Sequence, residues 1–205
     1  MRARSIVLLG ALLLAAAPGA HVEGRFYTLE TTALRYNIGS GAFASDSPVR
    51  ITKPGLDASA DRGEGNAKTG QATMRGNVAI HDAGGSGSLQ GKGAKPASLT
   101  CDLLEVDGKA DVYHAAGHVH YESTDRTATA DTMILDRKGK KLHLEGTVVL
   151  TQGASTARAA VVDVDLKSGR TVSTGSPVIL TEPASPAPRP EPAAPNPRPS
   201  PSPSP

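Results

Sequence analysis

Apolar and polar residues alternate along five segments of the chain, and these segments recur at a nearly constant spacing. Each contains a Gly-x-Val or Ser-Pro-Val pattern, and its central valine marks the repeat: Val49, Val78, Val119, Val148 and Val178. These valines are 29, 41, 29 and 30 residues apart. Because side chains alternate between the two faces of a β-strand, each segment predicts a strand with one apolar face. A fixed period of this length indicates stacked units that bury their apolar faces against one another.

The parity of the apolar residues predicts which side chains face the interior. In the fourth segment, the inward column contains Leu142, Leu144, Val148 and Leu150, with Gly146 between them. The same parity selects Val49 and Ile51 in the first segment, Met74, Val78 and Ile80 in the second, Tyr113, Val119 and Tyr121 in the third, and Val172, Val178 and Leu180 in the fifth. A shift of one residue would expose the whole set, so the register is well specified.

Each of three segments has a shorter strand upstream, which ends at Asp61, Asp102 or Asp131, 17 residues before the central valine. Gly-containing turns such as Thr69-Gly70 and Lys138-Gly139 lie between the two strands, where a tight reversal needs positive φ. The repeat unit is therefore strand, turn, strand, and the predicted fold class is all-β and elongated. Inward parity in the upstream strands stays open, because Met133 and Leu135 compete with Ala130 and Ile134.

Proline occupies the same column in the first and last segments only, at Pro48 and Pro177. Because proline cannot donate a hydrogen bond to a neighbouring strand, it is tolerated on edge strands. The two prolines therefore predict terminal units that protect the open edges of the sheet.

The two ends of the chain differ from the repeats. Arg2 and Arg4 precede an apolar run of about 12 residues and then small residues, which predicts a secretory signal over 1–20. An uncleaved signal would instead anchor the protein in the inner membrane. Residues 183–205 are rich in proline and predict an extended, disordered tail. The β-domain is expected over 21–182.

Composition narrows the function classes. Removing Arg2 and Arg4 with the signal leaves 20 basic and 20 acidic side chains, so the mature protein is nearly neutral. A nucleic-acid partner is not expected, because such a surface needs clustered positive charge. Cys101 is the only cysteine, so the exported chain forms no internal disulfide. Cys101 aligns with Ala60 and Ala130 and is expected to be a small core residue.

The repeated motif resembles the OstA-like superfamily of envelope proteins, which includes LptA, LptC and the N-terminal domain of LptD. The closest matches pair Ala58-Ser59-Ala60-Asp61 with Met74-Arg75-Gly76-Asn77-Val78-Ala79-Ile80, and Ala128-Thr129-Ala130-Asp131 with Leu144-Glu145-Gly146-Thr147-Val148-Val149-Leu150. The resemblance covers roughly 25–180. It implies an open β-jellyroll of two V-shaped sheets and a periplasmic role in carrying lipopolysaccharide. It also implies partners of the same jellyroll type that pair edge to edge.

A trough lined by aliphatic and small residues can hold hydrocarbon, since each buried methylene contributes about 0.8 kcal/mol. The expected lipid-binding residues are those of the inward column: Val49, Ile51, Met74, Val78, Ile80, Tyr113, Val119, Tyr121, Leu142, Leu144, Val148, Leu150, Val172, Val178 and Leu180. The expected ligand is lipopolysaccharide or a similar envelope glycolipid. One alternative is a repeat-built adaptor that pairs strand edges with envelope partners and binds no lipid.

The sequence offers little catalytic chemistry. Two histidines on one face can chelate zinc or copper, so His114, His118, His120 and His143 leave a metal-binding alternative open. A solvated polar face explains the same histidines. His120, Ser123 and Asp125 lie too close along one strand to form a nucleophile, base and orienting group. We therefore expect no enzymatic activity, no metal site and no cofactor.

Overall fold

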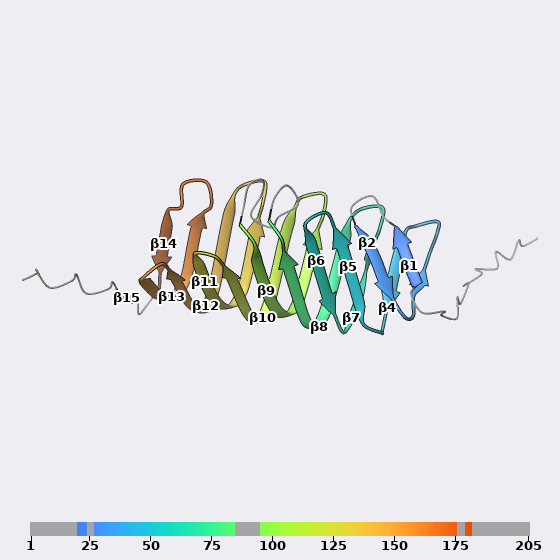
Figure 1. Cartoon of the computed structure of the whole chain (residues 1–205), viewed down its shortest axis with the longest axis horizontal. Helices are drawn as coiled ribbons and strands as arrows, with labels where there is room; N and C mark the ends of the chain where they lie inside the picture. The colour runs from blue at the N-terminus through green and yellow to red at the C-terminus, as the bar shows by residue number, and fades with distance from the viewer. Residues whose placement is uncertain (1–19, 24–26, 85–94, 176–178, 182–205) are drawn as a thin grey trace, which may run out of the picture.

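The computed structural model describes residues 20–23, 27–84, 95–175 and 179–181. This part of the chain is all β-structure and forms one elongated antiparallel sheet, with strands stacked side by side along the long axis (Figure 1). The expected all-β, elongated fold is confirmed. Residues 1–19 of the predicted signal, the Pro-rich tail, Val178 and Pro177 lie outside the described residues, whereas Ala20, the last residue of the predicted signal, is the first residue of strand β1 (Ala20–Glu23).

The sheet is a ladder of paired antiparallel strands. Six long strands cross the whole sheet: β8 (Gln71–Asp82), β9 (Ala97–Asp107), β10 (Val112–Ser123), β11 (Arg126–Asp136), β12 (Lys141–Gln152) and β13 (Ser155–Asp165). Shorter strands occupy the two ends: β1 (Ala20–Glu23), β2 (Thr28–Thr31), β3 (Arg35–Tyr36), β4 (Ala42–Ser45), β5 (Val49–Lys53), β6 (Leu56–Ala60), β7 (Arg62–Asn66), β14 (Thr171–Thr174) and β15 (Ile179–Thr181). Strands β8 to β14 pair in chain order, whereas at the N-terminal end β2 pairs with β5, β4 with β7 and β6 with β8. Of the three upstream strands that the sequence predicted to be short, β6 has five residues, but β9 and β11 are almost as long as the strands that follow them.

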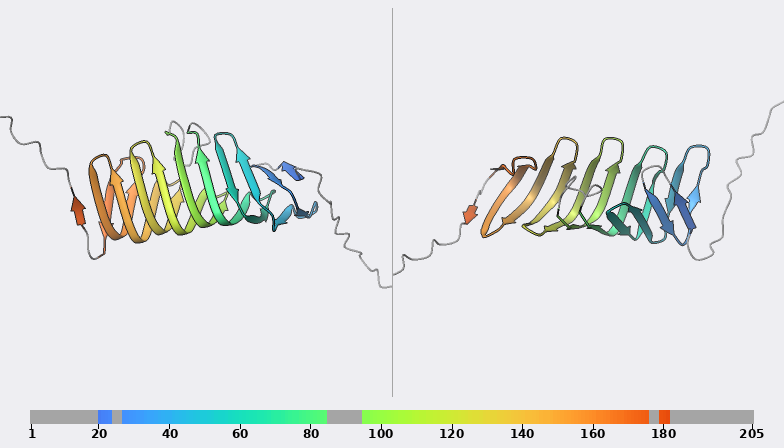
Figure 2. Two further views of the ribbon diagram at one scale, coloured as in Figure 1. Left: turned by 60° about the horizontal axis from the view of Figure 1, so that its bottom comes forward. Right: turned by 45° about the horizontal axis from the view of Figure 1, so that its top comes forward.

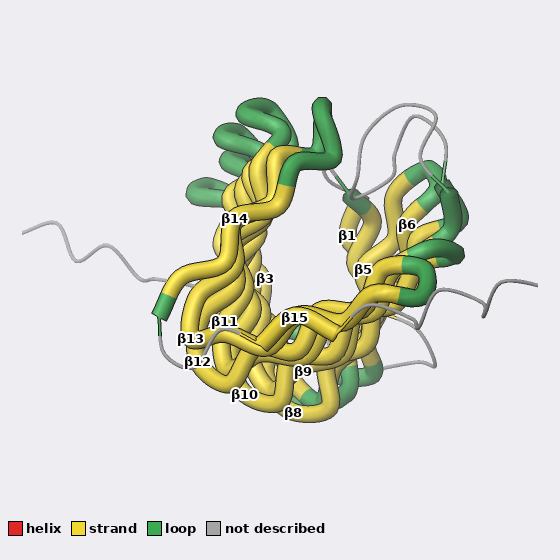
Figure 3. The backbone as a smooth tube through the Cα atoms, turned by 90° about the vertical axis from the view of Figure 1, so that its left-hand side faces the viewer, coloured by secondary structure: helices red, strands yellow, loops and turns green. Residues whose placement is uncertain are grey.

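The sheet is folded along its length into two walls that enclose an interior open on one side (Figure 3). Wall A contains β3, β4, β7, β14 and the halves of the long strands that end at turns 67–70, 108–111, 137–140 and 166–170. Wall B contains β1, β2, β5, β6, β15 and the other halves. Figure 2 shows the same strand stack from two further sides.

The fold between the walls passes through a row of β-bulges. In β8, β10 and β12 one extra residue separates the two halves, at Gly76–Asn77, Gly117–His118 and Gly146–Thr147. A bulge bends the strand that carries it and breaks the register locally. The three glycines have φ of +76°, +76° and +104°, a conformation that favours glycine over residues with a Cβ.

An aspartate faces each bulge glycine: Asp102 and Asp131 come from the preceding strands β9 and β11, and Asp61 lies between β6 and β7. A Cβ added to Gly76 would lie 2.5 Å from Asp61 Oδ2, and Gly117 and Gly146 contact Asp102 and Asp131 in the same way. The residue after each glycine then hydrogen-bonds to that aspartate: Asn77 Nδ2 at 2.9 Å, His118 Nδ1 at 2.7 Å and the Thr147 amide at 3.1 Å. The repeated Asp and Gly of the sequence motif are therefore the two sides of one corner.

The corner also explains the ambiguous parity of the upstream strands. In β11, Ala128 and Ala130 are buried on wall B, while Met133 and Leu135 are buried on wall A. Two consecutive outward residues, Asp131 and Thr132, separate the two buried pairs. Even-numbered residues of this strand therefore face inward in wall B, and odd-numbered residues face inward in wall A. Ile134 is not part of the inward set.

Two expectations from the sequence are wrong. Val172 pairs with the outward-facing Asp163 and is 42% exposed, so the inward face of β14 belongs to Thr171 and Ser173. Pro48 does not mark a sheet edge, because β5 pairs with both β2 and β6. Pro48 lies in the bend between β4 and β5, where no ladder hydrogen bond is needed, and its carbonyl accepts a hydrogen bond from Thr31 Oγ1 at 2.9 Å.

Candidate functional site

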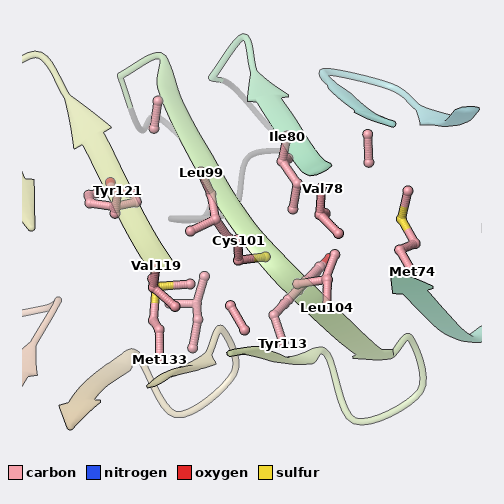
Figure 4. Packing of buried hydrophobic residues seen from close by; sticks show 14 of the residues in the cluster. Met74, Val78, Ile80, Leu99, Cys101, Leu104, Tyr113, Val119, Tyr121 and Met133 are labelled. Carbon is pink, nitrogen blue, oxygen red and sulfur yellow. The ribbon is translucent and has the colours of Figure 1, made fainter. Parts of the chain in front are cut away.

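The inner faces of the two walls form a continuous apolar interior, which we call the trough. Its largest fully buried side chains come from both walls and from strands along the whole ladder: Leu29, Met74, Ile80, Leu99, Leu104, Met133, Leu144, Val78, Val119, Val148 and Val162. Figure 4 shows such residues from neighbouring strands converging on one another. Because alternate residues face inward, aliphatic side chains of successive strands form unbroken rows along the molecule.

Most of the predicted site residues lie in the trough. Twelve of them are no more than 7% exposed: Val49, Ile51, Met74, Val78, Ile80, Tyr113, Val119, Tyr121, Leu142, Leu144, Val148 and Leu150. Leu180 lies in β15 in register with Ala157, which is itself paired with Leu150. Val172 faces outward, as described above, and does not belong to the site.

Sequence reasoning missed the contribution of the upstream strands. Leu99, Leu104, Leu135, Val162 and Val164 are also buried in the trough. Their alternation is present in the sequence on either side of the corner, for example at Val162 and Val164. At the corner this alternation shifts by one residue. A search that assumes the same alternation along the whole strand therefore misses the inward residues on one side of the corner.

A small cavity lies at the open side of the trough, which we call the mouth. It has a volume of about 90 Å³. Its lining joins residues of both walls: Tyr27, Ile51, Lys53, Leu56, Ala58, Gly70, Ala72, Met74, Ile80, Leu104, Val106, Gly108, Asp111 and Tyr113. Two polar contacts cross it between the walls. Lys53 Nζ donates to Tyr113 OH at 2.5 Å, and Tyr27 OH donates to the Gln71 carbonyl at 3.2 Å.

The electrostatics of the trough are those of an apolar environment. Burial raises the pKa of the Cys101 thiol to about 11, with a further contribution from the nearby Asp102 carboxylate. Burial likewise raises the pKa of the Tyr27 and Tyr121 hydroxyls. Because the charged form of each group is disfavoured, these side chains stay neutral at physiological pH. Cys101 is buried, as expected for a small core residue.

The histidines lie on the outer surface, and His118 and His120 share one face of β10. His114 and His143 share a row on wall A, but Ile134 lies between them. His118 bonds to Asp102 in the corner, and His143 Nδ1 bonds to Asp163 Oδ1 at 2.8 Å. Over the described ranges, no group of three or more His, Cys, Asp or Glu side chains is arranged to hold a metal ion. The part of the chain that the structure describes also contains no helix long and apolar enough to span a membrane.

Comparison with known families identifies this arrangement. The family described as LptA/(LptD N-terminal domain) LPS transport protein matches residues 57–170, more than half of the 205-residue chain. The chain belongs to this lipopolysaccharide transport family. A second family, described as lipopolysaccharide-assembly, LptC-related, matches residues 6–83. The resemblance to the OstA-like superfamily is thus confirmed, and the family match includes all six long strands in full, β8 to β13, and the three Gly–Asp corners.

The solved structures include a match to this Lpt-family chain. It is the crystal structure of LptH, the LptA-homologous periplasmic component of the lipopolysaccharide transport device from Pseudomonas aeruginosa. The two chains are 21% identical, with a TM-score of 0.47, and the match covers 65% of this chain and 90% of LptH. The comparison with curated proteins found no match.

Proposed function

We propose that this protein is a periplasmic bridge for lipopolysaccharide or a similar multi-acyl glycolipid, and that the acyl chains lie in the trough. The observation that supports this best is the unbroken apolar interior between two walls that are open to solvent on one side. Membership of a lipopolysaccharide transport family gives the class of cargo. The trough gives a surface suited to hydrocarbon, because burial of apolar area needs no specific hydrogen bonds.

The proposal requires the two walls to separate. The mouth cavity of about 90 Å³ is well below the roughly 300–1,000 Å³ of ordinary small-molecule sites. An acyl chain must therefore displace contacts between the inner faces of the walls. The corner is the natural hinge, because its glycines already have positive φ and the ladder is interrupted there on both sides.

Partner contacts are proposed at the ends of the ladder. Within the described residues, β1 pairs only with β2, and β14 pairs only with β13. Unpaired backbone donors and acceptors on such strands favour addition of a further strand. We infer edge-to-edge pairing with other jellyroll domains of the transport system. We also infer a carrier without enzymatic activity, since the role needs binding and release of lipid but no bond to be made or broken.

Photo-crosslinking tests whether lipid lies in the trough, because each inward site can be compared with an outward site next to it in the sequence. The photoreactive amino acid p-benzoylphenylalanine replaces Tyr113 or Tyr121, whose rings point inward, and His114 or His120 as matched outward controls. The purified chain is irradiated with radiolabelled lipopolysaccharide. We expect lipid adducts at Tyr113 and Tyr121 and none at His114 and His120.

Other patterns of adducts contradict the proposal. Equal labelling of inward and outward sites would mean that lipid coats the surface of the protein. The same variants can also be irradiated in cells that make lipopolysaccharide. Protein adducts without lipid adducts in those cells would favour the adaptor that binds envelope partners only.

A further inference from the structure

The turns of wall A form one rim along the open side of the trough, which we call lip A; only its first two turns border the mouth, through Gly70, Gly108 and Asp111. It comprises turns 67–70, 108–111, 137–140 and 166–170 with one strand residue on each side. Successive turns are hydrogen-bonded to one another, from the Gly108 amide to the Gly70 carbonyl at 3.0 Å and from the Leu166 amide to the Lys140 carbonyl at 2.8 Å. Hairpins repeat every two strands, so the turns are about 10 Å apart along the molecule. Lip A is therefore a regular row of fixed turns (Figure 3).

Basic side chains are concentrated on lip A. It carries eight of them against four carboxylates, a net charge of +4: Lys68, Lys109, Arg137, Lys138, Lys140, Lys141, Lys167 and Arg170, with Asp107, Asp111, Asp136 and Asp165. The opposite rim consists of the strand ends and described turn residues of wall B. It carries Lys53, Lys95 and Arg126 against Glu23, Asp82 and Asp125, a net charge of zero. Although the chain as a whole is nearly neutral, the described residues of the two rims therefore differ in net charge.

Three of the four carboxylates of lip A, Asp107, Asp136 and Asp165, accept hydrogen bonds from backbone amides of their own turns. Asp107 accepts hydrogen bonds from the Lys109 and Ala110 amides at 3.0 and 2.8 Å, and Asp136 accepts one from the Gly139 amide at 2.7 Å. Asp165 accepts hydrogen bonds from turn 166–170 in the same way, and the Ser168 amide lowers the pKa of its carboxyl group. These aspartates shape the turns.

The cations of lip A, in contrast, are largely without anionic partners. Arg137 pairs with Asp111 at 3.0 Å, but the other seven basic side chains form no ion pair with any described residue. Lys68 and Lys138 donate only to backbone carbonyls, those of Gly39 and Lys109. A row of positive charges, most of them outside any ion pair, beside an apolar interior attracts a ligand that is anionic at one end and apolar at the other.

We propose that lip A binds the phosphate groups of the lipid's sugar head while the acyl chains occupy the trough. This inference rests on the proposed function and adds an orientation to it: the head group lies over wall A and not over wall B. Lysine is suited to this role because its ammonium group binds phosphate from many directions. The regular spacing of the turns lets a lipid move from one turn to the next without losing its phosphate contacts.

Charge reversal on lip A tests the assignment. The double variant Lys109→Glu/Lys167→Glu changes the net charge of lip A from +4 to zero. The control, Arg62→Glu/Arg158→Glu, makes the same charge change at exposed outward positions. The probes are lipid A with two phosphates and the same lipid A after phosphatase treatment. Should the glutamates unfold the chain, Lys109→Gln/Lys167→Gln is measured instead.

We expect the parent and the control to bind the phosphorylated lipid roughly tenfold more tightly than the dephosphorylated one. The lip A variant should lose this preference, and its affinity for dephosphorylated lipid should be unchanged. A lip A variant that keeps the preference, or a parent that binds both lipids equally, would overturn the lip assignment and leave acyl binding in the trough intact. A parent that binds neither lipid would overturn the proposed function and the lip assignment together.

Discussion

At the scale of the residue, the inward column is defined by contrasts between neighbours. Val148 and Val149 are chemically identical and adjacent, but Val148 is buried at 1% exposure opposite Ala159, while Val149 faces outward opposite Arg158. Their difference lies only in the side of the sheet that each one meets. The same substitution at these two positions therefore tests which face of β12 lines the trough.

We predict that Val148→Asp destabilises the protein by about 3 kcal/mol or more, because it buries a carboxylate without a partner. Val149→Asp should cost within about 0.5 kcal/mol, since the new carboxylate faces solvent across from Arg158. Thermal and urea unfolding measure both changes. Equal losses of stability in the two variants would contradict the assigned inward face.

At the scale of the element, the corner converts one long strand into two half-strands of different walls. The Gly–Asp contact occurs three times, in β8, β10 and β12, with nearly the same geometry. Its glycines meet two requirements, positive φ and close approach of a carboxylate. Gly153, in the turn between β12 and β13, has only the first, with φ of +58° and no atom within 4 Å of an added Cβ.

This difference predicts unequal costs for one substitution. Gly153→Ala should lose about 1 kcal/mol for its left-handed backbone alone. Gly117→Ala should lose at least about 2 kcal/mol, because its Cβ also meets the Asp102 carboxylate. Unfolding in urea measures both.

Removing the obstructing carboxylate checks the cause. If the contact with Asp102 is responsible, Asp102→Ala should cost less in the Gly117→Ala background than in the parent. A cost that is the same in both backgrounds would mean that backbone strain explains the whole effect.

The strands and turns could be predicted from the sequence, because alternation over many residues is a property of the local chain. The motif aspartates and glycines were visible too, and so was the position of each turn. Their meeting at a corner could not be predicted, since it depends on which residues become neighbours across strands. For the same reason, Val172 was assigned to the wrong face: β14 is short, and its pairing with Asp163 decides its orientation.

At the scale of the whole molecule, two contacts hold the walls together across the mouth. The bond from Lys53 Nζ to Tyr113 OH joins β5 in wall B to β10 in wall A, and the ammonium group also lies 5.2 Å from the centre of the Tyr113 ring. If lipid enters through the mouth, this contact must open first. We therefore expect the Lys53–Tyr113 contact to have a large effect on the rate of lipid entry and only a small effect on the free energy of unfolding.

We predict that Tyr113→Phe changes the free energy of unfolding by about 1 kcal/mol and speeds uptake of a fluorescent acyl lipid by roughly two- to tenfold. Stopped-flow fluorescence measures the rate. Tyr121→Phe is the control, because the Tyr121 hydroxyl bonds to Ser123 of its own strand. The same change of rate in both variants would show that the bond across the mouth does not limit entry.

The ladder has one more consequence for the protein as a whole. Apart from contacts across the mouth such as Lys53–Tyr113, each strand contacts mainly the strands that pair with it, and most of these are close to it in the sequence. The protein is thus a one-dimensional chain of coupled hairpins, in which order can start at any rung and spread by zipping. The innermost rungs are secured on both sides, whereas β1 and β14 can fray singly. A partner strand that pairs with β1 or β14 would therefore do more than lengthen the trough. It would give that terminal strand a second neighbour and so protect it from fraying.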